Sequence, residues 1–404
     1  MFQGRRILLG IGGGIAAYKL CEVISTLGKA KAEVKVVMTQ QGTQFITPLT
    51  LATLSRHRVY TDQDFWQADH HRPLHIELGE WAEVLAIAPL TANTLGKLAH
   101  GLADNLLTNT VLASACPVLL APAMNTEMWQ QVPVQRNWQT IQRIPRYHSL
   151  APGEGILACD RQGTGRMAEP AEILTALESL LWTQGKQDLA GKCLLITAGG
   201  TREYLDPVRF LGNPSTGKMG VALAQAALMR GATVTLIHAP LIPPVPLHRD
   251  IKTFPIETAR EMQQALLQEF PQADWLLMAA AVGDMKPQKY SPVKLPKAEL
   301  PAQLPLTFVP DLLMELESRK QPHQKLIGFA AQTGNIVQPA WEKLKRKNLD
   351  AIVANPVDQT GVGFGTDQNQ AVFLGKTGEK QEVGRCSKLE LAHRLFDFLL
   401  ENLS

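Results

Sequence analysis

Residues 118–129 read Val118-Leu-Leu-Ala-Pro-Ala-Met-Asn-Thr-Glu-Met-Trp129. The apolar run at the start is typical of a strand buried in a parallel sheet. A polar amide and two thioethers follow where this strand ends, which is where open α/β sheets bind ligands. There an amide can hydrogen-bond a carboxylate while methionine and tryptophan exclude water. These features predict substrate contacts at Pro122, Met124, Asn125, Met128 and Trp129. A strand–loop junction with packing methionines is the alternative.

On both sides of this stretch, short β-rich runs alternate with helical patterns. Strands are predicted at 7–9, 33–38, 84–88 and 118–120, and helices at 16–27, 45–54, 92–100, 105–114 and 170–182. This order predicts an α/β fold whose first domain has a flavodoxin-like, doubly wound parallel sheet. The glycine-rich segment 149–167 lacks periodicity and is expected to be a functional loop.

The second half restarts the pattern and predicts a Rossmann-like sheet. Strands are predicted at 192–197, 233–237, 275–279, 325–329 and 351–353, and helices at 218–230, 258–270, 339–346 and 388–402. The Pro- and Lys-rich segment 285–310 is expected to be irregular. A chain of 404 residues exceeds the usual size of a single core. We therefore expect two domains, 1–187 and 188–404, joined through the polar residues 183–188.

The composition narrows the class of protein. The chain is 45% hydrophobic and 19% charged, as in ordinary globular proteins. A net charge of +3 gives no reason to expect a nucleic-acid or membrane partner. The 5 cysteines contain no Cys-x-x-Cys pair, which argues against a disulfide framework or zinc site. No apolar run reaches about 18 residues, so we expect a cytoplasmic protein.

A glycine turn, Gly10-Ile-Gly-Gly-Gly-Ile15, follows the first predicted strand and opens a helix. Such a turn lets backbone N–H groups approach a phosphate. Ile15 occupies the sixth position of Gly-x-Gly-x-x-Gly, so the single phosphate of flavin mononucleotide fits better than a dinucleotide. The predicted flavin contacts, for which ordinary caps and turns are the alternative, are Gly12, Gly13, Thr39, Thr91, Ala92 and Asn93.

Two further residues are candidates for proton transfer. His75 precedes the predicted strand 84–88, although a lone histidine is more often structural. Cys159 lies in the glycine-rich segment, where a thiol can donate a proton to a bound intermediate.

Together these residues resemble the flavin-dependent cysteine decarboxylase family over most of residues 1–180. The shared motifs are Gly-Gly-Ile-Ala-Ala-Tyr-Lys19, His75, Pro-x-Met-Asn-x-x-Met-Trp129 and Ala-Cys159. The resemblance implies bound FMN, His75 as base, Asn125 binding the substrate carboxylate and Cys159 protonating an enethiol intermediate. The chain departs from the family in having Gly12 where serine is common and Asp160-Arg161 after the cysteine.

In the second half, Gly212-x-x-x-x-Gly217-Lys218 nearly spells a P-loop, but Met219 replaces the magnesium-binding hydroxyl. We therefore expect Ser215 and Thr216 to cap a helix instead. The small residues before Asp284 allow a base or ribose to lie on the backbone. Lys294 follows on a loop able to reach phosphates, although a lone lysine is more often solvated surface.

Residues 188–404 resemble the phosphopantothenate–cysteine ligase family. The shared motifs are Asp206-Pro-Val-Arg-Phe-Leu-Gly-Asn213, Ser-Thr-Gly-Lys-Met-Gly220, Ala-Ala-Val-x-Asp284, Gly-Phe-Ala-Ala331 and Lys347-Asn-Leu-Asp350. The resemblance implies that Asn213 and Arg209 handle an acyl-cytidylate and that Lys294 contacts phosphates, with Mg²⁺ accompanying CTP. The implied CTP contacts are Met278, Ala279, Ala280, Asp284, Lys294, Val309, Pro310, Asp311, Phe329, Lys343 and Lys347. Pro296 and Val309 depart from the family pattern.

Fused in this order, the halves resemble the bifunctional enzymes of coenzyme A biosynthesis. The resemblance implies CTP-dependent ligation of cysteine to 4′-phosphopantothenate, then FMN-dependent decarboxylation to 4′-phosphopantetheine. It also implies a homo-oligomer, with a dodecamer of trimeric and dimeric contacts as one form. The alternatives are an NAD(P)H-binding dehydrogenase, a non-catalytic flavoprotein subunit and a prenyl-transferring flavoprotein.

Overall fold

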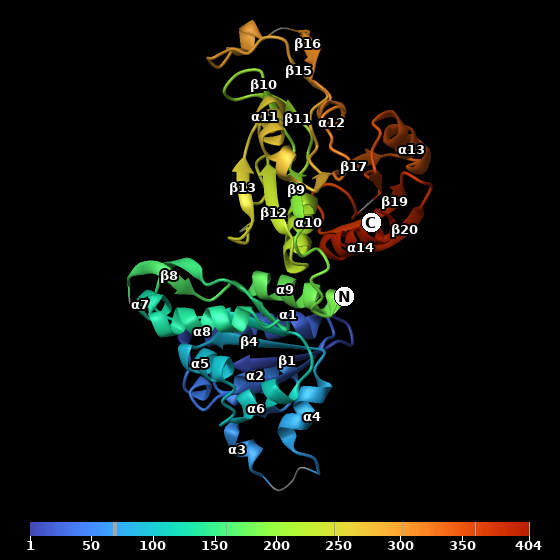
Figure 1. Cartoon of the computed structure of the whole chain (residues 1–404). Helices are drawn as coiled ribbons and strands as arrows, with labels where there is room; N and C mark the ends of the chain where they lie inside the picture. Colours follow the sequence, from blue (N-terminus) through green and yellow to red (C-terminus); the bar gives the residue numbers. More distant parts are fainter. Residues whose placement is uncertain (68–70, 159, 246, 301, 360, 404) are drawn as a thin grey trace. The chain divides into compact units, whose positions relative to one another are not determined.

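The computed structural model describes residues 1–67, 71–158, 160–245, 247–300, 302–359 and 361–403 (Figure 1). The chain divides into two units, Met1–Lys186 and Gln187–Ser404, and each has its own sheet and its own apolar core. No helix in the described part of the chain is long and apolar enough to cross a membrane.

Unit 1 is built on a parallel sheet of six strands in the order β3-β2-β1-β4-β5-β6. Without the two-residue edge strand β3, this is the flavodoxin-like order 2-1-3-4-5, which confirms the predicted fold class. The strands are β1 (Arg6–Ile11), β2 (Glu33–Met38), β3 (Val59–Tyr60), β4 (Val84–Leu90), β5 (Val118–Pro122) and β6 (Tyr147–Ser149).

Helix α5 of unit 1 begins and ends at signals that the sequence provides. The hydroxyl of Thr91 accepts a hydrogen bond from the Thr94 N–H at the start of α5, which ends at Gly101 with φ +68°. The longer helices are α1 (Leu20–Lys29), α2 (Pro48–Ser55), α4 (Leu74–Trp81), α5 (Ala92–His100), α6 (Leu106–Ala113), α8 (Val132–Gln142) and α9 (Pro170–Thr183). The short ones include η1 (Ile15–Lys19), α3 (Asp62–Phe65) and α7 (Thr126–Gln130).

The segment 149–167, which we expected to be a functional loop without periodicity, contains regular structure. It contains an antiparallel hairpin of β7 (Gly153–Ile156) and β8 (Gln162–Arg166). Glycines at 155 and 165, with φ of +145° and +150°, remove the side-chain alternation by which strands are recognised. A tertiary contact anchors the hairpin, because the Met124 N–H donates to the Gly165 carbonyl at 3.0 Å.

The main sheet of unit 2 has eight strands in the order β13-β12-β9-β14-β17-β18-β19-β20. The first six pair in parallel in the Rossmann order 3-2-1-4-5-6, as predicted, and β19 and β20 add antiparallel pairs. The strands are β9 (Cys193–Ala198), β12 (Thr233–His238), β13 (Lys252–Pro255), β14 (Trp275–Met278), β17 (Lys325–Gln332), β18 (Ala351–Pro356), β19 (Gln368–Gly375) and β20 (Lys380–Ser387).

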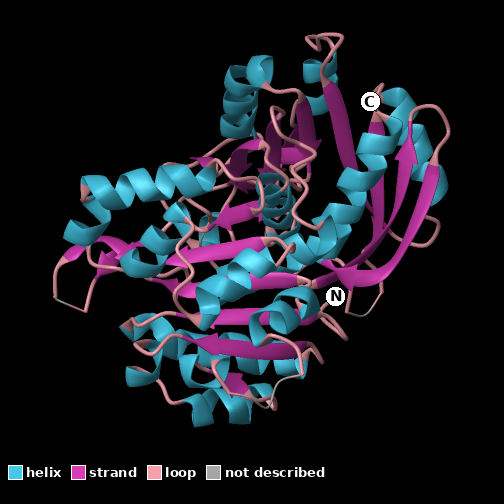
Figure 2. Cartoon of the chain, turned by 60° about the horizontal axis from the view of Figure 1, so that its bottom comes forward, coloured by secondary structure: helices cyan, strands magenta, loops and turns pink. Residues whose placement is uncertain are grey.

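Helices cover both faces of this sheet, and Figure 2 shows them in cyan beside the magenta strands. Leu194 and Ile196 of β9 pack toward α10 and α14, whereas Leu195 packs toward α11, α12 and α13, because successive strand residues face opposite ways. The helices are α10 (Lys218–Met229), α11 (Ala259–Glu269), α12 (Leu312–Glu317), α13 (Val337–Arg346) and α14 (Lys388–Asn402).

Some elements of unit 2 differ from the sequence predictions. The N-cap of α10 is Gly217, with φ +81° and no side-chain cap, so the prediction that Ser215 and Thr216 cap this helix is wrong. Segment 285–310 includes β15 (Met285–Pro287) and β16 (Leu306–Phe308), which form a hairpin. A second hairpin consists of β10 (Arg202–Tyr204) and β11 (Phe210–Gly212).

Candidate functional site

The strand order of unit 1 reverses between β1 and β4, and ligands bind at such switch points. Three loops that carry predicted flavin contacts meet there. The Gly12 N–H donates to the Pro89 carbonyl at 3.2 Å, and the Thr39 N–H donates to the Ile11 carbonyl at 3.0 Å. The ends of β1, β2 and β4 therefore form one edge of small residues and backbone.

The glycines at this edge are required by close approach of neighbouring loops. A Cβ on Gly12 would lie 2.5 Å from the Pro89 oxygen, and one on Gly13 would lie 2.4 Å from the Gln41 Cβ. The serine common in the family at position 12 therefore does not fit this loop arrangement without a shift. Gly14 is the N-cap of η1, so the first N–H groups of that helix face the same edge.

The threonines at the same edge are already engaged in the fold. Thr39 is buried, and its hydroxyl donates to the Ile11 carbonyl at 3.3 Å and accepts from the Gly42 N–H at 3.1 Å. The Thr91 hydroxyl caps α5, whose first turn holds the half-buried Ala92 and the exposed Asn93. Of these predicted contacts, Asn93 therefore presents its side chain most openly to a ligand.

Asn125 lies at the carboxyl end of β5 and caps α7. Its Oδ1 accepts a hydrogen bond from the Met128 N–H at 3.0 Å, and the Nδ2 group has no hydrogen bond within the described ranges. Met128 is 48% exposed beside it, and the Trp129 ring packs edge-on against Trp138 with centroids 5.3 Å apart. The amide therefore offers a donor next to apolar side chains.

The hairpin β7–β8 lies directly against this segment. A Cβ on Gly165 would come within 2.0 Å of the Met124 carbonyl oxygen, and one on Gly163 within 2.3 Å of the Thr126 hydroxyl. That hydroxyl is buried and has no hydrogen-bond partner among the described residues. Cys159 falls between the two strands in sequence and lies outside the described residues.

His75 stands on the first turn of α4, away from Asn125. Figure 1 shows α4 and α7 on different sides of unit 1. The His75 ring meets Phe65 edge-on at 5.5 Å, and its buried Nδ1 has no hydrogen-bond partner in the described part of the chain. Trp66, whose ring lies 4.7 Å from Phe65, is 83% exposed. One copy of unit 1 does not bring His75 and Asn125 together.

In unit 2 the strand order reverses between β9 and β14. The fully buried Thr201 accepts from the Gly283 N–H at 2.9 Å, and Thr197 accepts from the Ala280 N–H at 3.0 Å. The Asn213 amide donates to the Val282 carbonyl at 3.3 Å. Asn213 and the small residues after Met278 are thus held together, and their roles stay predictions. Thr197 and Thr201 were not predicted, although polar residues at a buried strand end are a usable signal.

Arg209 is fixed by a buried carboxylate. Asp206 has no exposed surface and accepts from the backbone N–H groups of Val208 and Arg209 at 2.8 Å and of Leu295 at 3.2 Å. Desolvation raises the pKa of Asp206, but these N–H groups and the Arg209 charge outweigh it and hold the pKa below its usual range. Arg209 also donates to the Leu295 carbonyl at 3.2 Å, which places the exposed Lys294 nearby along the chain.

Predicted nucleotide contacts also gather around α13. Lys343 donates to the Phe329 carbonyl at 2.8 Å, and Lys347 pairs with Asp311 at 2.8 Å. Burial, reinforced by the Lys347 charge and opposed by the charges of Asp311 and Asp284, lowers the pKa of Lys343 to about 8.

A backbone hydrogen bond joins the loop before Asp311 to Asp284. The Val309 N–H donates to the Asp284 carbonyl at 2.9 Å, and Pro310 follows. Within the described ranges, no group of three or more His, Cys, Asp or Glu side chains is placed to hold a metal ion.

Comparison with known proteins identifies both halves. The model of the Flavoprotein family matches residues 1–181, and that of the DNA/pantothenate metabolism flavoprotein C-terminal domain matches residues 189–403.

Solved structures are similar to each half of the chain, and a curated protein is similar to nearly all of it. A solved C-terminal domain of a coenzyme A biosynthesis bifunctional protein CoaBC is 33% identical, covering 54% of this chain and 98% of that one, with a TM-score of 0.46. A PPC decarboxylase mutant complexed with pantothenoylaminoethenethiol is 38% identical, covering 45% of this chain and 99% of that one, with a TM-score of 0.41. The coenzyme A biosynthesis bifunctional protein CoaBC of Bacillus subtilis is 42% identical, over 98% of this chain and 96% of its own length. The chain therefore belongs to the family of coenzyme A biosynthesis bifunctional proteins.

Proposed function

We propose that the chain catalyses two consecutive steps of coenzyme A biosynthesis. Unit 2 joins cysteine to 4′-phosphopantothenate at the expense of CTP, and unit 1 decarboxylates the product to 4′-phosphopantetheine. The observation that supports this most is that the sheet of each unit reverses its strand order, and that some predicted contacts meet at that switch point: the loops of Gly12, Thr39 and Thr91 in unit 1, and Asn213 with the residues after Met278 in unit 2. Two separate nucleotide-like sites suit two chemistries.

The edge formed by β1, β2 and β4 fits FMN. Its backbone-lined glycines leave no side chain to obstruct a phosphate, and Thr91, Ala92 and Asn93 start a helix whose N-terminus favours negative charge. When bound, FMN would accept two electrons from the thiol-bearing carbon, without which loss of CO₂ leaves an unstabilised carbanion, and would return them to the enethiol as it is protonated. Gly12, Gly13 and Thr39 hold the phosphate side of the site.

The residues around β5 handle the substrate. The amide nitrogen of Asn125 donates to the substrate carboxylate, while Pro122, Met124, Met128 and Trp129 keep water away from it. Cys159, which follows β7 and precedes β8 in the sequence, gives a proton to the enethiol. The unpartnered Thr126 hydroxyl is a further donor at this place.

His75 acts as the base from a neighbouring copy of the chain. Three observations favour a site completed between subunits: α4, which carries His75, and α7 lie on different sides of unit 1, the His75 Nδ1 has no partner among the described residues, and Trp66, which packs on Phe65 like His75, is exposed. A homo-oligomer, with trimeric contacts of unit 1 and dimeric contacts of unit 2, satisfies this requirement. In unit 2, exposed apolar side chains on the two hairpins, Phe210 and Phe308 among them, suit the dimeric contact.

In unit 2, CTP activates the carboxylate of 4′-phosphopantothenate, because a free carboxylate is a poor acyl donor. Asn213 and Arg209 hold the acyl-cytidylate, and Lys294 offsets charge that develops on pyrophosphate. Lys343, Lys347, Asp284 and Phe329 surround the nucleotide. Mg²⁺ enters with the CTP phosphates, because Mg²⁺ is commonly held by phosphates with one or two carboxylates.

A coupled assay tests both steps. The purified chain should be yellow, because its bound flavin absorbs at about 450 nm. With 4′-phosphopantothenate, cysteine, CTP and Mg²⁺ it should release CMP, pyrophosphate and CO₂. Cys159→Ser should still release CMP but stop at the oxidised enethiol. Full turnover by this variant would refute the proton-donor role, and absence of CMP from the wild type would refute the ligase.

A further inference from the structure

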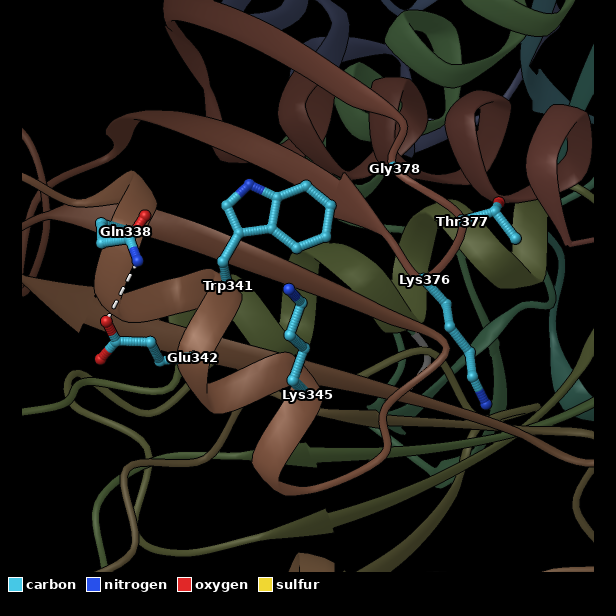
Figure 3. Close-up of a pocket in the computed structure, with 7 residues that line it drawn as sticks. All are labelled: Gln338, Trp341, Glu342, Lys345, Lys376, Thr377 and Gly378. Carbon is cyan, nitrogen blue, oxygen red and sulfur yellow. Dashed lines mark hydrogen bonds between the residues drawn. The ribbon is translucent and has the colours of Figure 1, made fainter.

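A cavity of about 450 Å³ lies in unit 2 between α13 and the turn that joins β19 to β20 (Figure 3). It belongs to no site described above. Its lining residues are Gln338, Trp341, Glu342, Lys345, Lys376, Thr377 and Gly378. Its volume falls in the range of about 300–1,000 Å³ that is usual for small-molecule sites.

The cavity lies on the opposite face of α13 from the predicted CTP contacts. Gln338, Trp341, Glu342 and Lys345 are spaced by three or four residues, so they share one face of the helix. Lys343 and Lys347, which are four residues apart, point the other way, to Phe329 and Asp311. A ligand in this cavity therefore does not occupy the CTP site.

The lining combines an aromatic wall with a cation. Trp341 is half-buried and packs against the core, which fixes the indole while leaving part of it in the cavity. Lys345 is exposed, comes from the same helix face, and has no ion pair in the described part of the chain. Lys376 is different, because its amine is held by Asn348 at 2.9 Å and points away from Trp341 in Figure 3.

Polar groups beside the indole are fixed as well. The Gln338 amide donates to the Glu342 carboxylate at 3.1 Å, which leaves the amide oxygen and the other carboxylate oxygen as acceptors. Aromatic rings bind nucleobases by stacking, and a lysine ammonium binds phosphate as a point charge. A planar base with an attached phosphate matches this set better than an apolar ligand or a free phosphate.

We propose that this cavity is an effector site for a nucleotide, with its base on Trp341 and its phosphate on Lys345. The cavity lies against one face of the short helix α13, and Lys343 and Lys347 lie on the other side. A bound ligand therefore shifts α13 and, with it, these two lysines of the proposed nucleotide site. The effect on the ligase rests on the proposed function, whereas binding itself does not.

Calorimetry on the full chain tests the binding. AMP, CMP and inorganic phosphate serve as probes on the wild type and on Lys343→Gln, a change in the predicted CTP site that leaves the lining of the cavity intact. The wild type should bind AMP or CMP. Trp341→Leu and Lys345→Gln should each weaken binding by about tenfold, the loss expected for one stacking or charge-assisted contact. Lys380→Gln is the matched control, since Lys380 lies on β20 outside the cavity and pairs with Glu382 at 2.7 Å.

Four results would overturn the site: no nucleotide binding by the wild type, equal binding by the wild type and the variants of Trp341 and Lys345, loss of that binding in Lys343→Gln, or binding of inorganic phosphate alone. Because Lys345 is exposed, its substitution keeps the test valid if Trp341→Leu does not fold. In the ligase assay, saturating AMP should change the KM for CTP in the wild type and not in Lys345→Gln. An unchanged wild-type KM would reject the effector role. Absence of CMP formation rejects the ligase proposal and leaves the calorimetric result intact.

Discussion

At the scale of single residues, Asn125 uses the two ends of its amide for different purposes. Its oxygen caps α7 through the Met128 N–H, and its nitrogen remains available for the substrate. Asn125→Asp keeps an oxygen acceptor for the cap but replaces the donor with a negative charge. We expect CO₂ release to fall by about 100-fold or more, because a carboxylate repels the substrate carboxylate.

CMP formation by Asn125→Asp should equal that of the wild type, since unit 2 is unaffected. The thermal unfolding midpoint should also change little, because aspartate caps helices as well as asparagine does. Normal CO₂ release by this variant would show that the amide donor does not bind the substrate.

The lowered pKa of Lys343 predicts that the ligase reaction depends on pH. Burial lowers the pKa of Lys343 to about 8, so this lysine is positive below that pH and neutral above it. Affinity for the anionic triphosphate should therefore fall as the pH rises through about 8. The measurement is the KM for CTP between about pH 6.5 and 9.5. A lysine with the usual pKa of about 10.4 would stay charged over most of this range and would not cause the rise in KM.

Lys343→Arg provides the control for this profile, because a guanidinium stays charged throughout this range. The rise of KM near the lysine pKa should disappear in this variant, even if the fork geometry changes the absolute KM. A profile that is identical in the two proteins would assign the titration to another group.

At the scale of elements, the hairpin β7–β8 depends on a missing side chain. A Cβ on Gly165 would lie 2.0 Å from the Met124 carbonyl, and φ at this residue is +150°. Gly165→Ala should displace the hairpin and with it Cys159, reducing CO₂ release by about tenfold or more while CMP formation persists. Gly153→Ala is the matched control, because its nearest contact would be at an ordinary 3.7 Å. If CO₂ release fell equally in the two variants, the close contact of Gly165 with Met124 would not be the cause.

A buried ion-pair network joins the start of unit 2 to two of its helices. Arg230, at the end of α10, is 2% exposed and donates to Asp188 at 2.6 Å and to Asp397 of α14 at 2.7 Å. Arg230→Met should lower the free energy of unfolding of unit 2 by about 2–3 kcal/mol, below the 3–5 of a fully buried pair because both carboxylates are partly hydrated.

Denaturant unfolding measures this loss, with Arg319→Met as the control. Arg319 pairs with Glu315 at 3.2 Å, but its side chain is 59% exposed. Its removal should cost at most about 0.5 kcal/mol. A comparable loss in the two variants would mean that burial of the Arg230 network does not stabilise the unit.

At the scale of the whole molecule, the two units have separate sheets and cores. We expect fragments 1–187 and 188–404 to fold independently. The first should bind FMN and be yellow, and the second should form CMP from CTP, cysteine and 4′-phosphopantothenate. Absorbance and CMP release check this prediction. A fragment that stays unfolded by circular dichroism would show that its core needs the other half.

Much of both units was predictable because apolar periodicity is local. The predicted helices 92–100 and 388–402 have the observed bounds, and the strand at 33–38 does too. Several strands were missed, among them β19 with its apolar run 371–374 and others that lack an apolar pattern. Strand β20, which reads Lys-Gln-Glu-Val-Gly-Arg-Cys-Ser, has one buried residue and lies at the edge of the described sheet, beside β19. Strands β7 and β8 were also missed, because their glycines interrupt the alternation of side chains.

By itself the sequence determined the α/β class, the two strand–helix series and the residue types at their ends, because burial pattern and capping act over a few residues. Only the tertiary structure decided which strand ends meet: the Gly12–Pro89 contact, the hairpin on Met124 and the cluster of Lys343 with Phe329. It also separated His75 from Asn125 within one copy. The physical reason is that such contacts join residues far apart in the chain, and their geometry depends on strand order and close packing rather than on local preference.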